Sequence, residues 1–168
     1  MMTLAEIKTE VDRRATLIGA TGHPSLPTYG RTEDGARPHI EANSRVYSLV
    51  VIERGQELSR LETQDLEELL YHIFEKVTHG LAWDYERAHR VETQDNRRIA
   101  YRKQVELLTQ ISGDWGRRQA QKHELTLRQH PLDDKMFARM SLSQQIGWAK
   151  ACEQFPLPKM SDETGQKT

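Results

Sequence analysis

Residues 45–81, RVYSLVVIERGQELSRLETQDLEELLYHIFEKVTHGL, change their hydrophobic period partway along. The segment 45–53 is rich in β-branched and aromatic residues, which favour a strand. A short Arg54–Gly55 turn leads into a second strand candidate at 56–61. After Thr63 the apolar residues recur every three or four positions, the period of an amphipathic helix. The stretch therefore predicts two hairpin strands and then a long helix over about residues 64–90, with Thr63 as its N-cap.

The residues before this stretch predict a helix and one more strand. Apolar residues recur at helical spacing from Leu4 to Ile18, and Gly19 and Gly22 end that helix. A proline-containing loop follows, and residues 36–42 form a strand candidate that reaches residue 45 through a short turn. Because short connections join antiparallel neighbours, the three strands are expected to form an antiparallel meander.

The residues after the long helix predict further helices. One apolar stripe runs from Tyr101 to Trp115, a weaker one from near 114 to near 128 ends before Pro131, and residues 141–155 suggest a last short helix. The expected fold class is α+β: an N-terminal helix, a three-stranded antiparallel meander, then a bundle of three to four helices. We expect one domain over residues 1–158 and a flexible polar tail over 159–168.

The middle strand candidate is apolar on both faces. Val46, Val50 and Ile52 point one way, while Tyr47, Leu49 and Val51 point the other. One helical layer covers only one face of a three-stranded sheet. We expect the N-terminal helix to cover the second face. A partner protein or a second copy of the chain, forming a homodimer, is the alternative cover.

Composition narrows the possible functions. The chain has 168 residues, a formal net charge of −1 and a single cysteine, Cys152. One cysteine excludes a disulfide framework and a multi-cysteine zinc site, and the charge provides no general attraction to nucleic acid or an anionic membrane. No signal peptide or apolar run of membrane-spanning length is evident, so a cytoplasmic protein is expected.

Catalytic motifs are few and incomplete. His39-Ile40-Glu41 resembles the His-x-Glu of zinc deaminases, but those sites also need a cysteine pair that this chain lacks. A small metal-dependent hydrolase using His39, Glu41 and Glu53 stays as an alternative. Glu86 and His89 form one Glu-x-x-His unit, where di-iron bundles need two. We therefore predict no catalytic residues, cofactor or bound metal, and no enzymatic activity.

Charges are grouped along the chain. Residues 53–75 hold seven acids and two arginines, and residues 87–103 hold six bases and two acids. We expect the two helices to pair antiparallel and neutralise each other, with Asp95, Arg97 and Arg98 bracing Glu86. Alternatively, the acidic stretch recognises a basic partner. The third interpretation is a nucleic-acid-binding regulator that uses Arg97, Arg98, Arg102 and Lys103, although this stretch carries few aromatic residues for stacking.

Five segments carry a family resemblance. In order they are LPTYGRTEDGARPHIE, YSLVVIERGQEL, DLEELLYHIFEKVTHGLAWDYE, DNRRIAYRKQVELL and HPLDD. Over about residues 4–134 this series resembles the immunity protein 63 family of bacterial polymorphic toxin systems. The resemblance implies an antitoxin for interbacterial competition, encoded next to its toxin. Such a protein binds the toxin's C-terminal domain tightly and occludes its active site without catalysis.

The expected toxin contacts lie in two places. Projecting loops commonly carry binding residues, and the loop at 26–37 contains two glycines and an Asp-Gly turn. The hairpin turn that begins at Glu53 is the second candidate. The predicted contact residues are Tyr29, Arg31, Glu33, Asp34, Glu53, Arg54 and Glu57.

Overall fold

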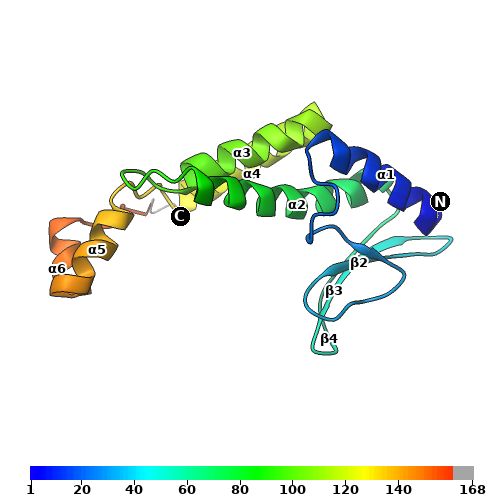
Figure 1. The fold of residues 1–168 in the computed structure, drawn as a ribbon, viewed down its shortest axis with the longest axis horizontal. Helices are drawn as coiled ribbons and strands as arrows, with labels where there is room; N and C mark the ends of the chain where they lie inside the picture. The colour runs from blue at the N-terminus through cyan, green and yellow to red at the C-terminus, as the bar shows by residue number, and fades with distance from the viewer. Residues whose placement is uncertain (161–168) are drawn as a thin grey trace, which may run out of the picture.

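The computed structural model describes residues 1–160 as an α+β fold (Figure 1). Beyond residue 160, the expected polar tail lies outside the described residues. None of the helices in residues 1–160 has the length and apolar character needed to cross a membrane. The elements are α1 (Leu4–Leu17), β1 (Thr28–Tyr29), β2 (Pro38–Ala42), β3 (Tyr47–Glu53), β4 (Gln56–Thr63), α2 (Leu66–Ala88), α3 (Arg97–Ile111), α4 (Gly113–Gln129), α5 (Met136–Ile146) and α6 (Trp148–Gln154).

The sheet has four strands in the order β1-β2-β3-β4. The expected meander of β2, β3 and β4 is confirmed, since both of its pairings are antiparallel. The expectation of three strands was wrong, because Thr28 and Tyr29 add the short strand β1, parallel to β2. A strand of two residues is too short to show the alternation of apolar and polar residues that identifies strands in a sequence. The strand is evident from the pairing of Thr28 with His39 and of Tyr29 with Ile40.

The hydrophobic core lies between one face of the sheet and the helices. Ile40, Tyr47 and Leu49 face α1 and α2 and belong to the same cluster of buried residues. The backbone N of Met2, beside α1, also donates to the Tyr47 hydroxyl at 2.7 Å. The expectation that α1 covers the opposite face was therefore wrong, because α1 packs on the same face as α2.

The opposite face of the sheet is covered by its own polar side chains. Val50 is fully buried although it is not part of the helical core cluster. Its cross-strand neighbours are His39 on β2 and Arg60 on β4. Long side chains such as arginine cover apolar surface with their stems while their charged ends stay in water. This face therefore needs no further helix to bury its central valine.

The N-cap of the long helix α2 lies two residues later than predicted. Asp65, and not Thr63, is the N-cap, and its carboxylate accepts from the backbone N of Glu67 at 2.8 Å. The Thr63 hydroxyl instead accepts from the N of Asp65 at 3.0 Å. Both residue types favour caps, so composition alone did not distinguish them. The apolar stripe of α2 is confirmed, since Leu70, Phe74 and other members are fully buried.

The acidic side of α2 pairs mainly with α4. Glu68 forms two bonds with Arg118, at 2.5 and 2.7 Å, and Arg118 holds the pKa of Glu68 at about 2. Burial alone would raise the pKa of Glu75, but His72 and Lys122 outweigh burial and bring that pKa to about 2. The expected pairing of α2 with α3 is confirmed by their extensive contact, but the expected neutralisation of α2 by the basic stretch of α3 was wrong. Charge counts along the chain do not specify which charged side chains meet across packed helices.

Glu86, at the end of α2, also has a different partner from the expected one. It is fully buried and binds the guanidinium of Arg90, one turn later, at 2.9 and 3.0 Å. Arg97 and Arg98 instead bind Asp95 and Asp134. The isolated Glu-x-x-His unit is thus a salt-bridging glutamate followed by an exposed histidine that stacks on Tyr85.

Helices α3 and α4 approach closely where Gly116 meets Thr109. A Cβ added at Gly116 would lie 2.0 Å from the Thr109 hydroxyl oxygen and 3.1 Å from its Cα. We predict that Gly116→Ala lowers the free energy of unfolding by about 2 kcal/mol, because the helices must separate. The expected loss is opposite in sign to the usual effect, since replacing a glycine inside a helix with alanine commonly increases stability. Urea denaturation checks it, with Gly113→Ala as the control, since a Cβ added there would lie 3.6 Å from a guanidinium N of Arg117, an ordinary contact distance. An equal effect of both changes would contradict the prediction.

The last part of the chain contains two short helices where one was expected. Gly147 has a φ of 86° and separates α5 from α6. Five helices therefore follow the sheet in the described residues, and not three or four. The sequence shows apolar residues on both sides of Gly147, and a single glycine inside a helical pattern is often tolerated. The break therefore had no clear sequence signal.

Candidate functional site

The two predicted contact segments form one continuous surface. The backbone N atoms of Gly35 and Ala36 donate to the carbonyl O of Ile52 at 3.3 and 3.0 Å. The backbone N of Gly55 donates to the Asp34 carboxylate at 3.1 Å. These bonds fix the loop 30–37 against the β3–β4 turn. We refer to residues 30–37 and 53–58 together as the loop–turn surface.

Backbone conformations that are costly for L-residues are concentrated on this surface. Within the described residues, the three non-glycine residues with positive φ are Asp34 (38°), Ala36 (59°) and Arg54 (52°). Such conformations cost about 1 kcal/mol or more each and are found disproportionately at functional sites. The predicted turn chemistry is confirmed, since Gly30 and Gly55 also have positive φ. The surface is therefore held in a defined and strained shape by its hydrogen bonds.

Six of the seven predicted contact residues lie on the loop–turn surface. Arg31 is largely exposed, and Glu33 accepts from Arg37 at 2.6 Å. Arg37 also donates to the carbonyl O of Leu26, which ties the base of the loop to the body. Tyr29 differs from the other six, since it is half-buried on β1 and packs against the core. Its burial raises the pKa of its phenol. The exposed contact residues are the other six: Arg31, Glu33, Asp34, Glu53, Arg54 and Glu57.

A leucine missed by the sequence analysis lies on the same surface. Val51 pairs with Ser59 and Ile52 pairs with Glu57, so a β-bulge leaves Leu58 without its own cross-strand partner. Its side chain is 57% exposed. Bulges often re-aim a side chain next to a functional site. An apolar residue within a charged rim is the usual anatomy of a protein interface. The sequence signal was an apolar residue beside a turn in an otherwise polar strand.

A polar network lies on the neighbouring outer face of the sheet. The His39 Nε2 lies 3.2 Å from a Glu41 carboxylate oxygen, and Arg60 donates to Glu41 at 2.8 Å and to Glu57 at 2.8 Å. Arg60 and, secondarily, His39 lower the pKa of Glu41. Within residues 1–160, no three His, Cys, Asp or Glu side chains are placed to hold a metal ion. His39 and Glu41 therefore meet, but the described residues give the metal-dependent alternative no ligand set.

The predicted nucleic-acid contacts are mostly engaged inside the molecule. Arg97 binds Asp95 and also donates to the carbonyl O atoms of His130 and Pro131, both at 2.8 Å. Arg98 binds Asp134 through two bonds of 2.8 Å, and Lys103 binds Glu106 at 2.9 Å. Arg102 is the remaining exposed cation of the four. The described structure thus offers no row of exposed cations along α3.

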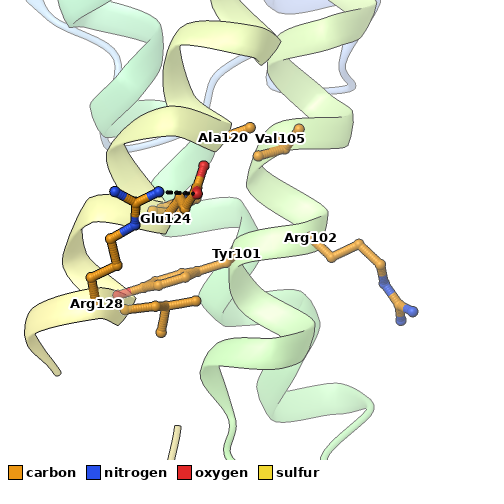
Figure 2. Close-up of a pocket in the computed structure, with 8 residues that line it drawn as sticks. Tyr101, Arg102, Val105, Ala120, Glu124 and Arg128 are labelled. Atoms are coloured by element: carbon orange, nitrogen blue, oxygen red, sulfur yellow. Dashed lines mark hydrogen bonds and ion pairs between the residues drawn. The ribbon is translucent and has the colours of Figure 1, made fainter. Parts of the chain in front are cut away.

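An apolar hollow of about 550 Å³ opens between α3 and α4 (Figure 2). The rings of Tyr101 and His123 stack in it, 3.7 Å apart and nearly parallel. Burial, with a smaller effect of nearby His79, lowers the pKa of His123 to about 4. The residues that line the hollow are Tyr101, Arg102, Val105, Ala120, His123, Glu124, Leu127 and Arg128.

The low pKa of His123 predicts acid sensitivity. The folded chain binds this proton less readily than the unfolded chain, whose histidines titrate near 6.5. Stability from this residue is complete above about pH 6.5 and is lost as the pH falls towards 4. We expect a loss of at most about 2 kcal/mol, because water partly screens the half-exposed ring. Between pH 7 and pH 4, urea denaturation should show a smaller loss of unfolding free energy for His123→Phe than for the wild-type chain. The same pH dependence in both proteins would contradict the assignment.

Comparison with known proteins identifies one family. Residues 43–125 match the family model described as immunity protein 63. The matched segment contains the turn residues 53–58, all of α3 and most of α4, and begins after the loop 30–37. No curated protein and no solved structure matches the chain. This match covers just under half of the chain and supports its assignment to the immunity protein 63 family, which implies an immunity protein that acts against a toxin.

Proposed function

We propose that this protein neutralises the C-terminal domain of a toxin encoded next to it by binding it tightly, in a one-to-one complex, through the loop–turn surface. The observation that carries the proposal is the joining of the loop 30–37 to the β3–β4 turn. A preformed surface loses little conformational entropy on binding, which favours tight association. Tight association is necessary, since a few unbound toxin molecules would harm the cell.

The composition of the surface supports a protein partner. Leu58 supplies an exposed apolar centre, and Glu53, Arg54 and Glu57 surround it along the same hairpin. A few residues near the centre of an interface commonly provide most of the binding energy, while a charged rim orients the partner. The acids of α2 fit this role less well, because Glu68 and Glu75, at 34% and 21% exposure, are less accessible than Glu33 and Glu57, at 40% and 42%. Recognition is therefore assigned to the sheet end of the molecule.

The proposed mechanism is occlusion of the toxin's active site by the projecting loop. Asp34 and Glu53 give this surface two carboxylates that have no ion pair within residues 1–160, and Glu33 and Glu57 add two that pair with arginines. Toxin domains that act on nucleic acids need basic clefts, into which such carboxylates would fit by charge complementarity. Under this proposal the chain carries out no reaction, and each copy of it neutralises one toxin domain.

Co-expression tests the proposed function. The adjacent toxin domain, produced alone, should arrest growth, and production of this chain in the same cells should restore growth. A tagged toxin domain should then co-purify with the chain in a one-to-one ratio. Growth arrest that persists despite normal levels of the chain would refute the proposal.

A further inference from the structure

The α5–α6 hairpin extends from the body at the end of the molecule far from the sheet (Figure 1). The two helices pack on each other, and no other helix or strand contacts either of them extensively. Only Arg139 and Ala151 are buried within them. Met140, Ile146 and Trp148 are exposed at 50%, 37% and 52%. A pair of short helices with so little core leaves large apolar side chains exposed, and clustered exposure of this kind commonly marks an interaction site.

The hairpin is held in its extended position by the linker 130–135. The backbone N of Asp133 donates to Asp95 at 2.7 Å, and the backbone N of Asp95 donates to Asp134 at 2.9 Å. Arg97 and Arg98 add four further bonds of 2.8 Å to the same linker. A linker with this many bonds to the start of α3 does not turn back freely. The exposed hairpin face is therefore directed away from its own chain.

The hollow between α3 and α4 is a matching apolar surface. It extends from Ala120 to Arg128 on α4, about 12 Å of helix, and α5, with 11 residues, is about 16 Å long. Apart from the buried Arg139, α5 carries no charged residue. An uncharged helix can enter an apolar hollow without the cost of desolvating charges.

The charges at the edges of the two surfaces are complementary. Arg102 borders the hollow on α3 and extends away from it (Figure 2), with no ion pair among the described residues. Glu153 on α6 is exposed and likewise has no ion pair within residues 1–160. A carboxylate on the hairpin and a guanidinium beside the hollow orient one surface on the other.

We propose that two copies of this chain form a symmetric dimer in which the α5–α6 hairpin of each copy docks into the α3–α4 hollow of the other. Trp148, Ile146 and Met140 supply the apolar contacts, and Glu153 approaches Arg102. A two-fold axis makes the two docking sites identical and closes the assembly. The loop–turn surface stays exposed at the far ends, so each dimer would bind two toxin domains.

Sedimentation equilibrium of the full chain, from about 1 µM to about 100 µM, tests the dimer, since this range brackets a micromolar dissociation constant. We expect dimers whose fraction rises with concentration. Trp148→Glu, on the hairpin, and Ala120→Glu, in the hollow, should each raise the dissociation constant at least about 30-fold. Both positions are exposed, so neither change should unfold the chain. Leu17→Glu, an equally exposed position on α1, is the control and should leave the dimer intact.

A mixing experiment separates this arrangement from other dimers. Trp148→Glu keeps an intact hollow, and Ala120→Glu keeps an intact hairpin. A mixture of the two variants should therefore form heterodimers through one intact docking site, although each variant alone is monomeric. A monomeric wild-type chain throughout the range, or a mixture without heterodimers, would overturn the proposal. Loss of toxin binding in both variants, with a monomeric wild-type chain, would assign the hollow to the toxin. Growth rescue tests the proposed function separately.

Discussion

Replacing Arg139 with methionine should release the α5–α6 hairpin at a cost of about 3–5 kcal/mol, the range for breaking a buried ion pair. Arg139 is 1% exposed and bonds to Asp133 at 2.5 and 3.1 Å. It also donates to the carbonyl O of Phe155 at 2.6 Å and of Pro156 at 2.9 Å. Its loss removes the guanidinium from the Asp133 carboxylate and leaves two carbonyls without their donor, at the centre of an element with almost no apolar core. Hydrogen exchange should show faster exchange in residues 136–154 and little change in residues 66–129.

Arg117 provides the matched control for this prediction. Its side chain is 72% exposed, and within residues 1–160 its one ion pair is with Asp114, one turn earlier on the same helix. Exposed pairs of this kind contribute little to stability, so Arg117→Met should alter exchange slightly or not at all. Unchanged exchange of the hairpin in Arg139→Met, or faster exchange throughout the chain, would contradict the role assigned to Arg139.

Leu58→Glu should weaken toxin binding at least about 30-fold, the effect of losing about 2 kcal/mol at a central interface residue. The change removes the apolar centre of the loop–turn surface and adds a charge that must be desolvated on binding. Leu58 is 57% exposed and occupies a bulge, so the fold of the chain should be preserved. Surface plasmon resonance with the immobilised toxin domain measures the affinity, and circular dichroism verifies the fold.

Leu125→Glu is the control for Leu58, because Leu125 is 59% exposed and lies on α4, far from the sheet. It should bind the toxin domain as tightly as the wild-type chain. If Leu58→Glu keeps wild-type affinity, or if both substitutions weaken binding equally, the loop–turn surface is not the principal contact.

The local elements of the fold were predictable because their signals lie within short windows. β3 and β4 follow from β-branched residues around an Arg-Gly turn, and α2 follows from its apolar stripe. The ends of α1 and α4 also lie within about one residue of the predicted ends. The stripe predicted from Tyr101 to Trp115 was displaced, because α3 spans Arg97–Ile111 and Trp115 lies on α4. The packing face of α1 was not predictable in this way. Both faces of β3 are apolar, and the coverage of Val50 by polar neighbours depends on strand register.

The candidate site was predictable in its parts but not in its assembly. The sequence indicated turn chemistry at Gly30, Asp34 and Gly55, and the positive φ angles confirm it. The joining of the loop to the turn depends on hydrogen bonds between residues about twenty positions apart, which no local pattern encodes. The role of Leu58 was hidden for the same reason, since a bulge is a property of two paired strands.

Hydrogen exchange of the chain with and without its toxin domain would locate the contact most directly. We expect slower exchange in the complex at residues 30–37 and 53–58, where the loop and turn would become covered. The hairpin residues 136–154 and the α3–α4 hollow should exchange as in the unbound dimer. Protection confined to the hairpin or the hollow, with none at the loop–turn surface, would contradict the proposed mode of toxin recognition.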